Sequence, residues 1–209
     1  MIVVHHLENS RSQRVLWLLE ELGLEYRVER YERDPKTMLA PPASRAVHPL
    51  GKSPVIVDGD TGRTVAETGA IVEYCVEKMG GAFGPPANEE ERLRYRYWLH
   101  YAEGSLMPPL LLKLVLSRIP IMGKAATKRI QPMIDIHLDY VEGELGERAW
   151  FAGDEISAAD IMMSFPLEAA RNRAGLDRTR PATMAWLEKV QARPAYRAAL
   201  AKGGPYAYA

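Results

Sequence analysis

The stretch Leu7–Gly23, which reads LENSRSQRVLWLLEELG, decides the fold because it connects a strand to a buried helix. The apolar run Ile2–Val4 before it predicts a strand, and a polar loop then leads straight into the helix. Apolar residues recur at the spacing of one helical face, at Val15, Leu18, Leu19 and Leu22. Leu16 and Trp17 add apolar surface beside that face, so we expect the helix to be covered on two sides.

The polar loop before this helix carries two hydroxyl groups, those of Ser10 and Ser12. We expect Ser12 to cap the start of the helix and Gly23 to end it in a left-handed turn. Hydroxyls and free N–H groups at a helix N-terminus suit a small anion, although such loops also occur for purely structural reasons. The loop is therefore a candidate anion site.

The composition is that of an ordinary globular protein of 209 residues, long enough for one large domain or two small ones. Lys plus Arg and Asp plus Glu both number 27, so neither nucleic acid nor an anionic membrane surface is an expected partner. The start is too polar for a signal peptide, and no run of about 20 apolar residues occurs. Cys75 is the single cysteine. We therefore expect a cytoplasmic protein without disulfides.

The pattern of strands and helices changes near residue 80. Residues 1–80 follow the order β-α-β, an irregular segment, and β-β-α, in which Pro54–Val57 and Arg63–Ala66 form a hairpin. Gly80–Asn88 is rich in glycine and proline and is typical of a linker. Residues 89–209 show only helical periodicity, and we expect the last helix to carry Trp186 and Val190 and to end before Arg193 and Pro194. The sequence predicts an α/β domain over 1–80 followed by an all-α domain over 89–209.

Four motifs stand in the order and at the spacing of the cytosolic glutathione transferases, and the chain resembles that family over its whole length. The variety most similar is the bacterial and fungal one with a serine in the first loop. The motifs are Asn9–Leu22, His48–Val55 (HPLGKSPV), Glu67–Ile71 (ETGAI) and Ala152–Ile161 (AGDEISAADI). The resemblance implies a thioredoxin-like first domain and an all-helical second domain that contributes the pocket for a hydrophobic co-substrate.

The resemblance assigns the binding of glutathione to residues of the first domain. It implies that the Ser53–Pro54 bond is cis and that the backbone of Ser53 pairs with the cysteinyl part of glutathione; in general, a trans proline at a strand start is commoner. Lys52 could hold the glycine carboxylate or be a solvated surface lysine. Glu67 suits the γ-glutamyl ammonium, and Thr68 suits its carboxylate, although Thr68 could equally be a plain helix cap.

The resemblance also points to Ser10 as the catalytic residue, because serine-type members carry their active hydroxyl four residues before the position of Arg14. Tyrosine or cysteine serves in other branches, and the first loop offers neither. Ser12 and Asn9 stay open as alternative donors to the sulfur. Ser12 is expected to cap the helix, which would occupy its oxygen, and this favours Ser10 as the catalytic residue.

The implied activity is conjugation of the glutathione thiolate to a small hydrophobic electrophile, with glutathione as co-substrate and no metal or organic cofactor. Alternatives are a glutathione-dependent isomerase, peroxidase or reductase on the same fold, or a binding protein without catalysis. Tyr101 and Met107 are candidates for the co-substrate pocket. The resemblance further implies a homodimer.

Three further features have structural interpretations. His5 and His6 are adjacent on a strand, so their side chains point to opposite faces and do not form a metal site. Cys75 lies within a helix and is interpreted as a small buried hydrophobic residue. The segment from Ser157 to Asp160 predicts a capping box in which Asp replaces the usual Glu or Gln.

Overall fold

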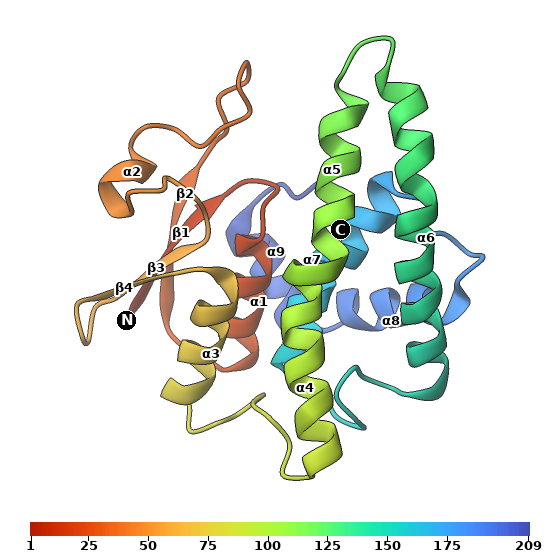
Figure 1. The fold of residues 1–209 in the computed structure, drawn as a ribbon. Coiled ribbons are helices and arrows are strands. Elements are labelled where there is room, and N and C mark those ends of the chain that lie inside the picture. The colour runs from red at the N-terminus through yellow and green to blue at the C-terminus, as the bar shows by residue number, and fades with distance from the viewer. The chain divides into compact units, whose positions relative to one another are not determined.

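The computed structural model describes residues 1–209, which divide into two compact units (Figure 1). The first unit contains Met1–Gly84, Gln191–Ala207 and Ala209, and the second contains Pro85–Val190 and Tyr208. The first is an α/β unit and the second is all-helical, which confirms the predicted fold class. The assignment of separate functions to residues 1–80 and 89–209 stays a prediction.

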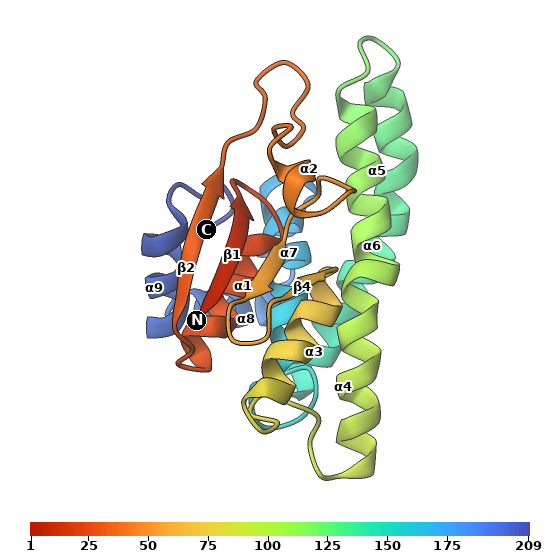
Figure 2. The same ribbon diagram turned by 90° about the vertical axis from the view of Figure 1, so that its left-hand side faces the viewer.

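The first unit is built on a four-stranded sheet in the order β2-β1-β3-β4. β1 pairs parallel with β2 and antiparallel with β3, and β3 pairs antiparallel with β4. Figure 2 shows β1 and β2 running side by side in the same direction. The elements are β1 (Ile2–Leu7), α1 (Ser12–Glu21), β2 (Tyr26–Tyr31), α2 (Ser44–Val47), β3 (Val55–Asp58), β4 (Arg63–Ala66), α3 (Thr68–Lys78) and α9 (Pro194–Gly203).

Helix α1 is the most completely buried helix of this unit, as its two apolar faces predict. Its residues from Ser12 to Leu19 are all buried, and it packs on β1, α3 and α9. Trp17 meets Tyr196 of α9 edge to face at 5.6 Å between ring centroids. The carboxylate of Glu21 binds the guanidinium of Arg193, with 2.9 Å between Nη2 and Oε2.

The sequence does not predict helix α9, because its last predicted helix ends before Arg193 and Pro194. Pro194 instead occupies the first turn of a new helix, where its missing N–H costs nothing. This helix belongs to the α/β unit, although the domain assignment placed all of residues 89–209 in the helical part. The contacts of Trp17 and Glu21 are the physical reason for its position.

A buried ion pair fixes the helix α3 against the end of β3. The side chain of Asp58 is fully buried, and its Oδ2 lies 2.8 Å from Nζ of Lys78. It also accepts a hydrogen bond from the hydroxyl of Tyr74. The Lys78 ammonium, followed by the Tyr74 hydroxyl, holds the pKa of Asp58 well below its usual range. These contacts orient α3, whose first residue is Thr68.

The second unit is made of helices alone, and no helix of the chain is long and apolar enough to span a membrane. Asn88 caps the first of them, since its Oδ1 accepts hydrogen bonds from the N–H groups of Glu90 and Glu91. A π-helical turn connects the first helix to the next one, which begins just before Pro108. The elements are α4 (Glu89–Tyr101), the π-turn Ala102–Leu106, α5 (Met107–Ser117), α6 (Gly123–Glu147), α7 (Ala158–Arg173) and α8 (Pro181–Gln191).

The predicted capping box at the start of α7 is present. Asp160 is fully buried, and its carboxylate accepts hydrogen bonds from the N–H groups of Ser157 (2.9 Å) and Phe151 (3.0 Å). The Ser157 hydroxyl donates a third, at 3.1 Å. Burial raises the pKa of Asp160 to about 6, although these hydrogen bonds act in the opposite direction. The box thus satisfies donors at a helix start that water does not reach.

Candidate active site

Three serines of the predicted site meet at the end of β1. The N–H of Leu7, the last residue of β1, lies 3.1 Å from Oγ of Ser53 and 3.3 Å from Oγ of Ser12. Ser53 also donates its hydroxyl to the carbonyl of His5 at 2.8 Å. Ser10 Oγ in turn lies 2.7 Å from Ser12 Oγ. The loop before α1 and the segment before β3 are therefore joined at one point.

The strand register brings the remaining predicted glutathione residues to the same edge of the sheet. His5 pairs with Val55, and Val55 pairs with Ala66. Ser53 and Pro54 lie just beyond Val55, and the bond between them is cis, as the resemblance implied. Glu67 and Thr68 follow directly after Ala66. The register thus places the backbone of Ser53, and the start of α3, beside the end of β1.

The prediction that Ser12 caps helix α1 is wrong. No side chain caps this helix at the position before Ser12, and the Ser12 hydroxyl points back toward the strand. Its Oγ lies 2.9 Å from Nδ1 of His6 and 3.2 Å from the carbonyl oxygen of Leu7. The Ser12 side chain is fully buried. The Ser12 hydroxyl therefore contacts groups of strand β1 and does not cap the helix.

Ser10 performs the capping that was expected of Ser12. Its Oγ accepts the N–H of Ser12 at 3.2 Å, and its carbonyl accepts the N–H of Gln13 at 3.2 Å. Ser10 lies at the positive end of the helix and is 6% exposed, whereas Ser12 is fully buried.

Glu67 has an unusual backbone conformation, with φ at +69°. A non-glycine residue in this region costs roughly 1–3 kcal/mol and is found disproportionately at functional sites. No side chain caps helix α3, which begins at the next residue, so its first N–H groups have no side-chain partner. Thr68 is buried and makes no hydrogen bond with its hydroxyl within the protein. This helix start can therefore accept a carboxylate.

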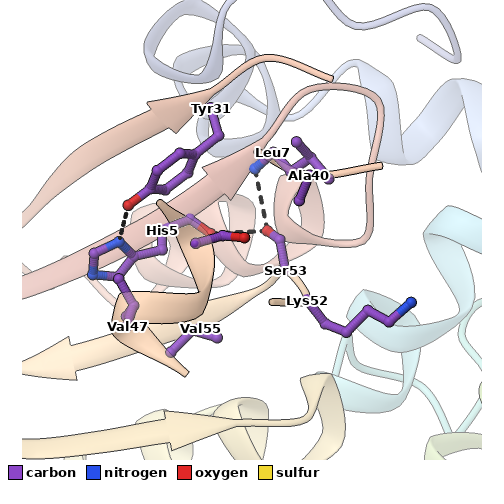
Figure 3. Close-up of a pocket in the computed structure, with 9 residues that line it drawn as sticks. His5, Leu7, Tyr31, Ala40, Val47, Lys52, Ser53 and Val55 are labelled. Carbon is purple, nitrogen blue, oxygen red and sulfur yellow. Dashed lines mark hydrogen bonds between the residues drawn. The ribbon is translucent and has the colours of Figure 1, made fainter. Parts of the chain in front are cut away.

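A small cavity lies beside the site, between the end of β1 and the segment of α2 (Figure 3). Its volume is about 10 Å³, room for about one water molecule, so it is not the glutathione site. His5 and Tyr31 form one wall, with 2.9 Å between Nδ1 and the hydroxyl oxygen. Lys52 is exposed, and its side chain extends away from His5 and Tyr31, so its ammonium is open to solvent or to a ligand.

His6 and Asn9 were not predicted to have the positions that the structure gives them. His6 is buried behind Ser12, while His5 faces Tyr31, which confirms that the two rings point to opposite faces. Burial, and then the charge of Arg30, lowers the pKa of His6 to about 4, so its ring is neutral at pH 7. Nothing in the sequence distinguished His6 from His5. No group of side chains in the chain could hold a metal ion.

The side chain of Asn9, which the sequence left open as a donor to the sulfur, is directed elsewhere. Its Oδ1 accepts the N–H of Ala207 at 2.7 Å, and its φ is +49°. The guanidinium of Arg33 donates to the carbonyls of Glu8 and Asn9, at 3.3 and 3.4 Å. No local pattern could have identified this contact of Arg33, because these two carbonyls lie more than 20 residues before it in the chain.

Comparison with known proteins decides the family. The family described as "Glutathione S-transferase, N-terminal domain" matches residues 10–78, and "Glutathione S-transferase, C-terminal domain" matches residues 108–194. Glutathione S-transferase 3 of Schizosaccharomyces pombe is 37% identical, and the alignment covers 97% of this chain and 88% of the relative. The chain belongs to the glutathione S-transferase family.

Other members of the family agree with this placement. Glutathione S-transferase 1 of Saccharomyces cerevisiae is 34% identical, over 97% of this chain and 95% of the relative. A solved glutathione S-transferase structure from Actinobacillus pleuropneumoniae superposes with a TM-score of 0.88 at 32% identity, covering 100% of this chain and 95% of that one. The family predicted from the sequence is confirmed.

In this member of the family, Tyr101 and Met107 are both interior residues of the helical unit. Tyr101 is 7% exposed, and its hydroxyl lies 2.5 Å from Nδ1 of His137. Met107 is 2% exposed. The structure therefore adds no support to their role in a co-substrate pocket, which stays a prediction.

Cys75 is fully buried in α3, as its interpretation as a small hydrophobic residue requires. Burial raises the pKa of its thiol to about 12. The candidate site therefore contains no cysteine thiol.

Proposed function

We propose that this chain conjugates the thiolate of glutathione to small hydrophobic electrophiles, with Ser10 as the group that contacts the sulfur. The chain is a glutathione transferase, and its co-substrate is glutathione. The observation that carries the role of Ser10 is its position: its hydroxyl lies at the N-terminus of α1 and contacts Ser12, whose Oγ shares the N–H of Leu7 with Ser53. A glutathione transferase family member from Pseudomonas fluorescens, 25% identical with a TM-score of 0.80 over 95% of this chain and 92% of that one, was solved with two glutathione bound.

The chemistry required of the site is activation of a thiol. A free thiol has a pKa of about 8.5, so only a few per cent is thiolate at pH 7. Lowering that pKa by about 2 units requires about 2.7 kcal/mol of preferential stabilisation of the thiolate. A hydrogen bond from the Ser10 hydroxyl, together with the positive end of α1, is of that size. The thiol proton passes to solvent, and the sulfur forms a bond to the electrophilic carbon. The leaving group of that carbon departs with its bonding electron pair, as halide does from an aryl halide, and the thioether product then dissociates.

The tripeptide is proposed to lie along the edge of the sheet. The backbone of Ser53, beyond the last residue pair of β3, pairs with the cysteinyl residue, and Lys52 holds the glycine carboxylate. Glu67 binds the γ-glutamyl ammonium, while the hydroxyl of Thr68 and the start of α3 bind its carboxylate. This order is supported by the register: Val55 pairs with both His5 and Ala66, so the segments that contain Ser53 and Glu67 leave the sheet at the same edge.

The proposed activity is tested by assaying the purified chain with glutathione and a generic aryl halide. We expect formation of the thioether, and little reduction of a mixed disulfide, because reductases of this fold use a cysteine that the first loop lacks. Reduction of a hydroperoxide in the same assay series measures the peroxidase alternative. Retention on a glutathione column without any turnover would instead identify a binding protein.

Glu67→Gln is expected to weaken glutathione binding by about 10- to 100-fold. The substitution keeps the size of the side chain and removes the charge that pairs with the ammonium, and a charge-assisted hydrogen bond contributes about 1.5–3 kcal/mol. Calorimetric titration with glutathione measures the affinity. Glu25→Gln is the matched control, because Glu25 is exposed at the opposite end of β1 and its carbonyl binds the N–H of Ile2. An unchanged affinity in Glu67→Gln would place the γ-glutamyl group elsewhere.

We also propose that the chain forms a homodimer, as the resemblance implies, and that it is cytoplasmic. The resemblance implies that the first domain of one subunit pairs with the helical domain of the other. The candidate contact residues are the Glu73–Glu77 face of α3 and Leu93–Arg96 of α4, in which Leu93 is 66% exposed. Light scattering at micromolar concentration is expected to give twice the chain mass of 23.4 kDa. A single species at the chain mass would contradict the dimer.

A further inference from the structure

The loop that carries Ser10 is held on one side by buried side chains that reach Gly203. Ser10 Oγ lies 2.7 Å from Ser12 Oγ, which lies 2.9 Å from Nδ1 of His6. The ring of His6 lies beside Gly203, the last residue of α9. None of the three side chains exposes more than 6% of its surface.

Ser12 connects His6 to Ser10. On one side, its Oγ contacts Nδ1 of His6 and lies 3.2 Å from the carbonyl oxygen of Leu7. On the other side, its N–H donates to the Ser10 oxygen at 3.2 Å. This N–H bond holds the Ser10 oxygen and leaves the proton of the Ser10 hydroxyl for the sulfur.

Gly203 approaches this chain so closely that it has no room for a side chain. A Cβ at this position would lie 2.6 Å from Oε1 of Gln13 and 3.4 Å from Cε1 of His6. Gln13 belongs to the first turn of α1, directly after Ser12. The end of α9 is therefore packed against the start of α1 and against the ring that orients Ser12.

The same segment holds the loop from its other side. The N–H of Ala207 donates to Oδ1 of Asn9 at 2.7 Å, and Asn9 immediately precedes Ser10. Asn9 has a left-handed backbone, with φ at +49°, which asparagine tolerates better than most residues. A hydrogen bond to its side chain stabilises that conformation and thereby the direction in which the chain enters Ser10.

We infer that the segment Gly203–Ala207 positions Ser10 for the activation of glutathione, through His6 and Ser12 on one side of the loop and through Asn9 on the other. The inference rests on the proposed function, in which the Ser10 hydroxyl contacts the sulfur. A hydrogen bond stabilises the thiolate only when the donor is aimed at it, and a displacement of about 1 Å can cost up to about 100-fold in rate. His6, Asn9 and the segment are positioning residues that do not touch the sulfur.

The first test removes the hydrogen bond between Ala207 and Asn9 from either end. Ala207→Pro lacks the N–H, and Ala207→Gly is the matched control that keeps it. Asn9→Gly keeps the left-handed backbone and removes the acceptor. In Ala207→Pro and Asn9→Gly we expect the pKa of the bound glutathione thiol, measured by thiolate absorbance against pH, to rise by about 0.5–1 unit. kcat should fall while KM for glutathione stays nearly constant, and the double variant should show no further change.

The second test addresses the buried side. His6→Leu removes the ring nitrogen that contacts the Ser12 hydroxyl, whereas His6→Asn retains a hydrogen-bonding group near the place of Nδ1. We expect His6→Leu to raise the pKa of the bound thiol by a similar amount and His6→Asn to recover the greater part of that shift. A lowered unfolding midpoint with an unchanged thiol pKa, in both His6→Leu and Ala207→Pro, would overturn the inference.

Repeating the substitutions in a Ser10→Ala background separates this inference from the proposed function. If the segment acts through Ser10, Ala207→Pro has no further effect on the thiol pKa there, whereas a persisting shift would overturn the inference. If Ser10→Ala alone leaves the thiol pKa unchanged, the role of Ser10 fails first. If Ser10→Ala raises the pKa but neither Ala207→Pro nor His6→Leu does, the positioning role alone fails.

Discussion

Ser10→Ala is expected to raise the pKa of enzyme-bound glutathione by about 1–2 units, because it removes a hydrogen bond to a charged sulfur worth about 1.5–3 kcal/mol. At neutral pH the thiolate fraction then falls, and kcat for conjugation should fall by about 10- to 100-fold. Thiolate absorbance of the bound tripeptide against pH measures the shift directly. The fold should survive, since the lost cap on α1 costs only about 1 kcal/mol.

Ser10→Thr and Ser12→Ala are the controls for this experiment. Ser10→Thr keeps a hydroxyl at the same position and should retain a lowered thiol pKa. Ser12→Ala should raise the thiol pKa by less than Ser10→Ala, because Ser12 is fully buried and can act only through Ser10. If Ser10→Ala left the thiol pKa where it was and Ser12→Ala raised it, Ser12 would be the contact.

Asp160→Ala is expected to lower the free energy of unfolding by about 3–5 kcal/mol, a large part of the stability of a typical domain. The substitution leaves the N–H groups of Phe151 and Ser157 without partners in a buried place. Each such donor costs about 1–3 kcal/mol. Urea unfolding of both proteins measures the difference. Ser157→Ala, which loses a single hydroxyl, should cost only about 1 kcal/mol, and equal losses in the two variants would contradict the central role of the carboxylate.

The pH dependence of stability provides a second check on Asp160. Its pKa is about 6 in the folded chain and about 3.9 in an unfolded one, so between about pH 4 and pH 6 the folded state holds a proton that the unfolded state has released. The titration of Asp160 therefore lowers the free energy of unfolding as pH rises through that window. The titration of His6 raises the free energy of unfolding in the same window, because the pKa of His6 is about 4 when folded and about 6.5 when unfolded. The difference in unfolding free energy between wild type and Asp160→Asn isolates the contribution of Asp160, and its dependence on pH should be visible across this window.

Features that depend on neighbouring residues could be predicted from the sequence. The burial of α1 followed from the spacing of Val15, Leu18 and Leu19, and the hairpin followed from the turn between two short apolar runs. The capping box needed only Ser157 and Asp160, three residues apart. In each case the residues that make the interaction lie within about one turn of each other, so the pattern contains the cause.

Features that depend on distant partners could not be predicted in this way. Ser12 has the residue type and position of a helix cap, but its hydroxyl contacts His6 and Leu7 of β1 instead. Helix α9 was missed because a proline can either end one helix or begin the next, and only the contacts of Arg193 with Glu21 decide between them. The role of Asn9 likewise depends on Ala207, 198 residues away. The residue types of the candidate site could therefore be predicted from the sequence. The hydrogen bonds that distinguish Asn9, Ser10 and Ser12 could not.

The burial of Cys75 has a consequence for the durability of the enzyme. A catalyst of the proposed kind works in the presence of compounds that alkylate thiols, and its own thiols are targets for them. With a pKa of about 12, Cys75 exists as thiolate at pH 7 in only about one molecule in 10⁵, and it is also shielded from solvent. Since Cys75 is the single cysteine of the chain, the folded enzyme presents no thiol that could compete with glutathione for the electrophile. The protein is thus protected from inactivation by its own co-substrates for as long as helix α3 stays folded.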